Sequence, residues 1–160
     1  PLQGEQKKVT NWMVLVGANP DKDFSHLWHY TTDQPEGDWQ QKDFDDAAWK
    51  VGKAGFGQKG GSDQYIQTPW NTADIYLRQT FTCDTVDFDA AALIIHYDDD
   101  TEVYVNGTKI WSHKDWNDRY EFFDITGPLR DSMQAGENTI AVYCHQNGGG
   151  QFIDLAILVE

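Results

Sequence analysis

The sequence predicts an all-β fold, a sandwich of two antiparallel sheets with one or two short helices. Short β-type runs separated by turn residues dominate the chain. Several of them alternate apolar and polar side chains, as in "IYLRQTF" and "TEVYV". Many short strands with almost no helix are typical of a β-sandwich. The predicted strands are 12–16, 75–82, 91–97, 101–105, 108–111, 120–125, 139–145 and 152–159.

After the first predicted strand, residues 19–71 are rich in Gly, Asp, Gln and Lys, with Trp and Phe scattered among them. This composition predicts extended loops that are held in place by buried rings. Within this stretch, "DFDDAAW" (43–49) could form one helical turn with Asp43 as its cap.

A second and longer helix is predicted in "TGPLRDSMQAG", over about two turns. Thr126 or Gly127 can cap its start, and Pro128 suits the first helical position because its missing N–H has no partner there anyway. Gly136 suits its end.

The strand "AALIIHY" is apolar enough to be central in its sheet, and three aspartates follow it directly. Aspartate stabilises turns by bonding its own backbone, so the run predicts a turn. Calcium could still bind Asp98, Asp100 and a carbonyl oxygen, although Val103 stands where an EF-hand loop needs glycine. A glycosidase needs two carboxyls about 5 to 9.5 Å apart. With 26 acidic residues, some pair will meet that spacing by chance.

Asn106-Gly107 predicts a tight hairpin, because both central residues of a type I′ turn need positive φ. The expected pairs are Val105 with Thr108, Tyr104 with Lys109, Val103 with Ile110, and Glu102 with Trp111. Alternation then places Val103, Val105 and Ile110 on the core face. The opposite face carries Glu102, Tyr104, Lys109 and Trp111, a mixture of rings and polar groups that suits a sugar. The alternative is that a neighbouring loop covers Trp111.

Charge and length limit the function further. The 160 residues fit one domain over 1–160, and the formal net charge of −14 disfavours nucleic acid and anionic membranes as partners. No stretch approaches the roughly 20 apolar residues of a membrane span. The chain starts at Pro1 instead of Met, so we expect a piece of a larger multidomain protein, a processed mature chain being the alternative. Seven tryptophans exceed what a core of this size needs, so some should be exposed.

Two cysteines, Cys83 and Cys144, lie in strand-like sequence and match no zinc-binding spacing. Buried free thiols are the simpler expectation. A single disulfide in an exported protein stays open as the alternative.

The segments "VYVNGTKIW", "YEFFDITGPLR" and "GENTIAVYCHQ" resemble, in this order, the sugar-binding-type jelly-roll domain of family-two glycoside hydrolases. More broadly, the pattern is similar to the galactose-binding-like superfamily. Upstream, "DWQQKDFDDAAWKVGKAGFG" and "IYLRQTF" fit the same pattern. The resemblance covers about residues 35–158 and leaves 1–34 outside. Trp39, Trp49, Arg78 and Asn106 match motif positions that are structural.

The resemblance implies a two-sheet antiparallel jelly roll in an extracytoplasmic, often bacterial, glycan-processing protein, where this domain is an accessory. Some members of the superfamily bind sugars through loops at one end of the sandwich, others brace a catalytic barrel, and many carry a structural calcium. Its binding loops vary, so no ligand-binding residue can be assigned by motif.

Candidate ligand contacts are therefore rings and polar groups in loop-like surroundings. Trp116 is the strongest, because all its immediate neighbours are polar. For any one tryptophan, core packing is the alternative. The full set is Trp70, Trp111, Trp116, Asn117, Arg119, Gln146 and Asn147, the last two beginning the glycine-rich "QNGGGQ" loop.

The predicted function is a non-catalytic carbohydrate-binding or accessory module. It needs no cofactor, a structural calcium ion aside. Its expected partners are a carbohydrate or polysaccharide and a neighbouring catalytic domain in the same chain. The alternatives are a domain that braces that neighbour without binding sugar and, in third place, a stand-alone glycoside hydrolase.

Overall fold

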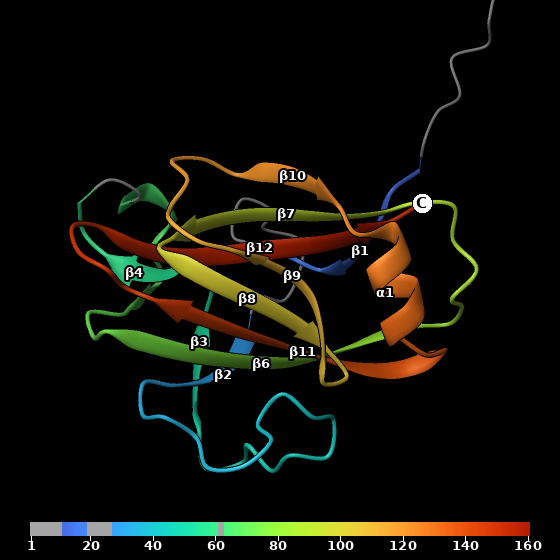
Figure 1. Cartoon of the computed structure of the whole chain (residues 1–160), viewed down its shortest axis with the longest axis horizontal. Coiled ribbons are helices and arrows are strands. Elements are labelled where there is room, and N and C mark those ends of the chain that lie inside the picture. The colour runs from blue at the N-terminus through green and yellow to red at the C-terminus, as the bar shows by residue number, and fades with distance from the viewer. Residues whose placement is uncertain (1–10, 19–26, 61–62) are drawn as a thin grey trace, which may run out of the picture.

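The computed structural model describes residues 11–18, 27–60 and 63–160, and their strands form the two packed sheets that the sequence predicts (Figure 1). The β7/β12 sheet has the order β10-β7-β12-β4-β5, with β1 also paired to β12. The β6/β11 sheet has the order β3-β2-β6-β11-β8-β9. Every pairing is antiparallel except that of β4 with β5. The first sheet comprises β1 (Met13–Val16), β4 (Phe56–Gln58), β5 (Thr68–Pro69), β7 (Ala91–Asp98), β10 (Glu121–Asp124) and β12 (Gln151–Val159); the second comprises β2 (Leu27–Thr31), β3 (Lys50–Lys53), β6 (Asp74–Cys83), β8 (Asp100–Val105), β9 (Thr108–His113) and β11 (Gly136–His145).

All eight predicted strands are present, with ends shifted by at most three residues. The structure adds four strands, β2 to β5, inside the stretch predicted as loops. They have two to five residues each, too few to show a periodic pattern. They exist because longer strands offer open edges, β6 to β2 and β12 to β4.

The predicted helical turn over 43–49 is wrong: these residues form bends and turns, with the N–H of Trp49 donating to the carbonyl of Asp46 at 2.9 Å. Tertiary contacts of this segment, described below, outweigh a single turn of helix, which is unstable alone. A short 3₁₀ turn, η1, lies instead at Asp63–Tyr65.

The second predicted helix is confirmed as α1 (Thr126–Ser132), which closes one end of the sandwich (Figure 1). Its predicted caps are wrong. Ile125 takes the N-cap position without a side-chain bond, while Asp124 accepts the N–H of Thr126 at 2.9 Å. Gly136 lies beyond the helix end and starts β11 with a φ of +98°.

The Asn106-Gly107 turn is confirmed, with φ values of +49° and +86°. The amide of Asn106 ties the hairpin to its surroundings: it donates to Ser132 O and Asn138 Oδ1, and accepts the N–H of Thr139. This is the structural role that its motif position implied.

Beyond the turn, the predicted hairpin register holds for two pairs and then fails. A bulge between Val103 and Tyr104 shifts β9 by one residue, so that Val103 pairs with Trp111 and Glu102 with Ser112. One residue of shift moves a side chain to the other face of a sheet. Trp111 therefore lies on the core side, with its ring centroid 5.3 Å from that of Tyr97. The prediction that Trp111 shares the outer face with Glu102 is wrong.

The core between the sheets holds the predicted aliphatic face of the hairpin, Val103, Val105 and Ile110, all at least nine-tenths buried. Cys83 and Cys144 are buried free thiols. Cys144 pairs across the ladder with Ile75, at the far end of β6 from Cys83, so the two sulfurs are too distant for a disulfide.

Residues 32–49 cover part of the outer face of the β6/β11 sheet, as the cyan loop in Figure 1 shows. Trp39 packs edge-on against Tyr76 on that face, with ring centroids 5.2 Å apart. Trp39 also meets Trp49, which, with Phe44, packs against the same small cluster. The predicted role of buried rings in holding this stretch is confirmed here.

Candidate functional site

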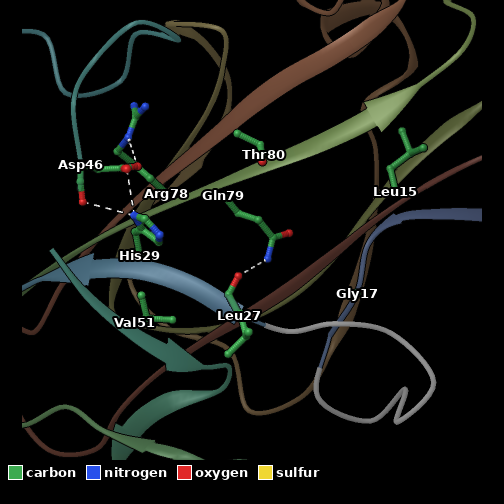
Figure 2. Close-up of a pocket in the computed structure, with 9 residues that line it drawn as sticks. All are labelled: Leu15, Gly17, Leu27, His29, Asp46, Val51, Arg78, Gln79 and Thr80. Carbon is green, nitrogen blue, oxygen red and sulfur yellow. Dashed lines mark hydrogen bonds and ion pairs between the residues drawn. The ribbon is translucent and has the colours of Figure 1, made fainter. Parts of the chain in front are cut away.

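A first hollow lies beside β2 and β6 and is occupied by an ionic network (Figure 2). Arg78 is 3% exposed, and its Nε donates to Asp46 Oδ2 at 2.8 Å. Its terminal nitrogens donate to the carbonyls of Trp39, Gln41 and Phe44. The other oxygen of Asp46 meets Nδ1 of His29 at 2.8 Å. Because the guanidinium is committed to loop 32–49, we assign these residues the role of anchoring that loop.

A second hollow, which we call the Trp116 pocket, lies at the end of the sandwich opposite α1, where β7 ends and β12 begins. Its volume is about 370 Å³. Trp116 is 61% exposed and lines this pocket together with four glycines. The lining consists of Gly60, His96, Asp98, Trp116, Asn117, Asp118 and Gly148, Gly149 and Gly150.

Asn117 holds Trp116 in position. Its Oδ1 accepts the N–H of Tyr97 at 2.8 Å, its Nδ2 donates to Ile95 O at 3.1 Å, and its own N–H donates to Tyr97 O. The amide thus continues the ladder of β7. These three bonds go to the backbone of β7, which argues against the ligand contact predicted for this side chain.

The carboxyl of Asp98, which lines the pocket, has a raised pKa. Burial, a hydrogen bond with Asp99 and the negative charge of Asp99 raise the pKa of Asp98 to about 7. Asp99 in turn accepts the N–H of Asn147 through Oδ2 at 2.7 Å. A Cβ at Gly150 would lie 3.0 Å from Asp98 Oδ2, so a side chain at this position would crowd the carboxyl. Perturbed acids of this kind concentrate at functional sites.

The two aspartates predicted to share a calcium ion line different hollows. Asp98 lines the Trp116 pocket, whereas Asp100 lines a groove on the sheet face and accepts the N–H of Asp115 at 2.9 Å. Across the described ranges, no three His, Cys, Asp or Glu side chains are grouped to hold a metal. Calcium binding at Asp98 and Asp100 stays a prediction.

We expect Asp98→Asn to weaken the pH dependence of stability. The raised pKa means that the folded state holds a proton that the unfolded state releases between about pH 4 and pH 7, so stability falls as pH rises through this window. An amide cannot ionise, so the drop in Tm between pH 5 and pH 8 should be smaller in the variant, as thermal unfolding would measure.

Asp100→Asn is the matched control. The N–H of Asp115 lowers the pKa of Asp100, so this carboxyl contributes stability with the opposite sign, and its loss should not reduce the drop. An equal pH dependence in wild type and Asp98→Asn would contradict the assignment.

The remaining predicted contacts are scattered. Trp70 is 2% exposed in the core, and its Nε1 donates to Thr72 Oγ1 and Asp74 O, so it cannot stack on a ligand, and that prediction is wrong. Arg119 is highly exposed and pairs only loosely with Asp118, at 3.4 Å. Gln146 and Asn147 do begin the glycine loop: Nε2 of Gln146 donates to Gly149 O and shapes it.

A third hollow, the sheet-face groove, has a volume of about 560 Å³ and lies on the outer face of β11, β8 and β9. Sequence reasoning missed a group of side chains that includes two of its lining residues, Tyr143 and His145. Asp74 Oδ1 accepts the hydroxyl of Tyr143 and meets Nδ1 of His145, each at 2.7 Å. Burial raises the pKa of Asp74, but these two hydrogen bonds outweigh it and hold the pKa below its ordinary value. These residues lie on two strands, so no local motif could have joined them.

Solved structures share this fold. A β-glycosidase from Bacteroides vulgatus matches with a TM-score of 0.58 and 18% identity, over 85% of this chain and 20% of its own. A β-glucuronidase from Bacteroides uniformis matches with a TM-score of 0.61 and 13% identity, over 93% and 18%. A family-two member from Bacteroides cellulosilyticus matches with a TM-score of 0.58 and 16% identity, over 84% and 20%. The chain resembles a domain of family-two glycoside hydrolases.

The likeness to family-two enzymes is one of fold, because every identity quoted is below 20%. The chain spans about a fifth of the length of these structures. No protein-family model matches the sequence. No curated protein is significantly similar to it. Among the described residues, no helix has the length and apolarity to cross a membrane.

Proposed function

We propose that this chain is a non-catalytic carbohydrate-binding module of an extracytoplasmic glycan-processing protein, and that the Trp116 pocket holds the sugar. The observation that carries the proposal is the pocket itself: an indole that is 61% exposed faces a hollow of about 370 Å³ with carboxyl and backbone groups around it. Binding sites of small ligands combine an apolar wall with a few placed polar groups in this way.

Each part of the pocket has a task in holding a sugar. The indole offers a flat apolar face to the C–H side of a pyranose ring, at low entropic cost because Asn117 fixes the loop. The carboxyls of Asp98 and Asp118 can accept bonds from hydroxyls. The bare backbone from Gly148 to Gly150 lets the ligand approach closely.

Trp116→Ala should abolish most carbohydrate affinity, with a loss of about 2 kcal/mol or roughly 30-fold in Kd, because an aromatic anchor carries much of a small interface. A glycan array of plant, host and microbial polysaccharides would identify the ligand, and calorimetry would measure both proteins. Trp116→Phe, which keeps a ring, should retain part of the affinity. Absence of binding to every polysaccharide by the wild-type protein would contradict the proposal.

A second candidate function, bracing a neighbouring catalytic domain, is favoured by the outer face of the β7/β12 sheet. An apolar hollow of about 370 Å³ lies there, lined by Val14, Ala18, Ile94, Ala156 and Leu158 together with Tyr65 and Tyr120. On nearby β10, Phe122 is 60% exposed. The share of the matching glycosidases that this chain spans supports the presence of such a neighbour.

Phe122→Glu tests this second function. In the isolated domain it should change stability by less than about 0.5 kcal/mol, as surface substitutions usually do. In the full-length protein it should lower the Tm of the transition that includes this domain, since a charge would enter a dry interface. Equal Tm values for wild type and variant at full length, measured by calorimetry, would exclude bracing through this face.

A further inference from the structure

The outer face of the β6/β11 sheet presents ordered rows of side chains next to loop 32–49. Register places Tyr76, Tyr143, Glu102 and Ser112 in one row across β6, β11, β8 and β9. The adjacent row contains Asp74, His145 and Asp100. Because the rows stand on hydrogen-bonded strands, which lie side by side in Figure 1, their spacing is set by the ladder.

We infer that the sheet-face groove is a second binding site, for a neutral glycan chain, distinct from the Trp116 pocket. The inference rests on the proposed carbohydrate-binding function but not on that pocket. The groove volume, about 560 Å³, lies within the range of roughly 300 to 1,000 Å³ that is usual for small-molecule sites.

The polar groups of the groove are fixed before any ligand arrives. Asp74 holds Tyr143 and His145 at 2.7 Å each, and Tyr143 stacks on Tyr76 with ring centroids 5.1 Å apart. Side chains that are already ordered lose little entropy on binding. Nδ1 of His145 is committed to Asp74, and the His145 side chain lines the groove.

Glu102 is fixed in the same way on the next strand. Tyr104 donates its hydroxyl to one oxygen of Glu102, and Lys109 lies 3.5 Å from the other. The Lys109 ammonium is also 5.8 Å from the Tyr104 ring centroid. About a third of the Glu102 side chain remains exposed, so its carboxylate can still accept hydroxyl protons.

The charge pattern favours a neutral ligand. Two acids of the lining, Asp100 and Glu102, stand against two lysines, Lys109 and Lys114, and each acid already has a hydrogen-bond or ionic partner. A charged ligand would have to displace those partners, whereas a polyol can use the remaining lone pairs and N–H groups. Hydroxyls both donate and accept, which matches this mixed lining.

The position of the groove favours a chain over a single sugar. Asp98 lines the Trp116 pocket and Asp100 lines the groove, so the two sites flank one turn and are separated along the backbone by Asp99 alone. Two neighbouring subsites on one ligand raise the apparent affinity through effective concentration.

A titration followed at two reporters tests the second site. Neutral hexasaccharides of glucose, xylose, galactose and mannose would be added to labelled protein while NMR records the His145 ring and the Trp116 indole, each assigned with a variant, His145→Gln and Trp116→Phe. We expect at least one hexasaccharide to shift the His145 ring resonances saturably, in the wild type and still in Trp116→Ala.

Glu102→Ala should weaken the shift at His145 by about tenfold in Kd, the value of one bond to a charged acceptor. Glu137→Ala is the matched control, because Glu137 is exposed on β11, six residues from Tyr143 and outside the groove. It should leave the titration unchanged.

The outcomes separate the two proposals. If the Trp116 indole moves and the His145 ring does not, the groove is overturned and the Trp116 pocket stands. If the His145 ring moves alone, the groove stands and the Trp116 pocket fails. A His145 shift that disappears in Trp116→Ala would overturn a distinct second site, and no shift at either reporter would overturn both.

Discussion

Replacing Arg78 with methionine is expected to destabilise the domain by about 3 to 5 kcal/mol, the usual cost of breaking a buried ion pair. Arg78 is 3% exposed and binds Asp46 and three backbone carbonyls of loop 32–49. Methionine fills a similar volume but leaves these acceptors unpaired. For a domain of this size, Tm should fall by roughly 10 °C or more, measured by thermal unfolding.

The control is Arg119→Met, since the Arg119 side chain is 72% exposed and its ion pair with Asp118 is long, at 3.4 Å. It should change stability by less than about 0.5 kcal/mol. Hydrogen exchange adds a local test. In Arg78→Met, amides of residues 32–49 should lose protection before those of β6 and β11. Equal stability of the two variants would show that loop 32–49 does not depend on Arg78.

Trp70→Ala is expected to cost about 3 to 5 kcal/mol through the large cavity it leaves. Trp70 is 2% exposed and belongs to the core cluster, where its Nε1 donates to Thr72 and Asp74. Denaturant unfolding would measure the loss. Any effect on carbohydrate binding should follow the folded fraction and disappear at a temperature where the variant is folded.

Trp116→Ala is the matched comparison for Trp70→Ala, because it removes the same side chain from an exposed site. It should leave stability within about 0.5 kcal/mol of wild type. Trp70→Ala should therefore lower stability and leave the binding site intact, whereas Trp116→Ala should lower sugar affinity and leave stability unchanged. A stable Trp70→Ala protein that fails to bind sugar would restore Trp70 as a ligand contact.

The sequence predictions were correct where a feature depends on neighbouring residues and wrong where it depends on distant parts of the chain. The sequence predicted the Asn106-Gly107 turn, because the two turn residues themselves favour positive φ. It also predicted the long strands β6, β7, β11 and β12, because the pattern of apolar residues is visible within each segment. Strands β2 to β5 were missed because distant edges create them. The helical turn at 43–49 was wrong because Arg78, far along the chain, holds that segment in another shape.

The predictions for individual site residues were also correct or wrong according to whether neighbouring or distant residues decide their exposure. Polar neighbours marked Trp116 as exposed, and the structure agrees. The same argument failed for Trp70, which has polar neighbours in sequence but core neighbours in space. It failed for Trp111 because one bulge residue reversed its face. The triad of Asp74, Tyr143 and His145 could not be predicted, since its members come together only through the pairing of β6 with β11.

By itself, the sequence determined the two-sheet architecture, the hairpin turn, the aliphatic core face and the resemblance to a family-two accessory domain. The tertiary structure decided which tryptophans are exposed, where Asp98 and Asp100 point, and which strands fill the sheet edges. The physical reason is range: backbone preferences and alternation act within a few residues, whereas burial and strand register depend on partners that the chain meets only after it has folded.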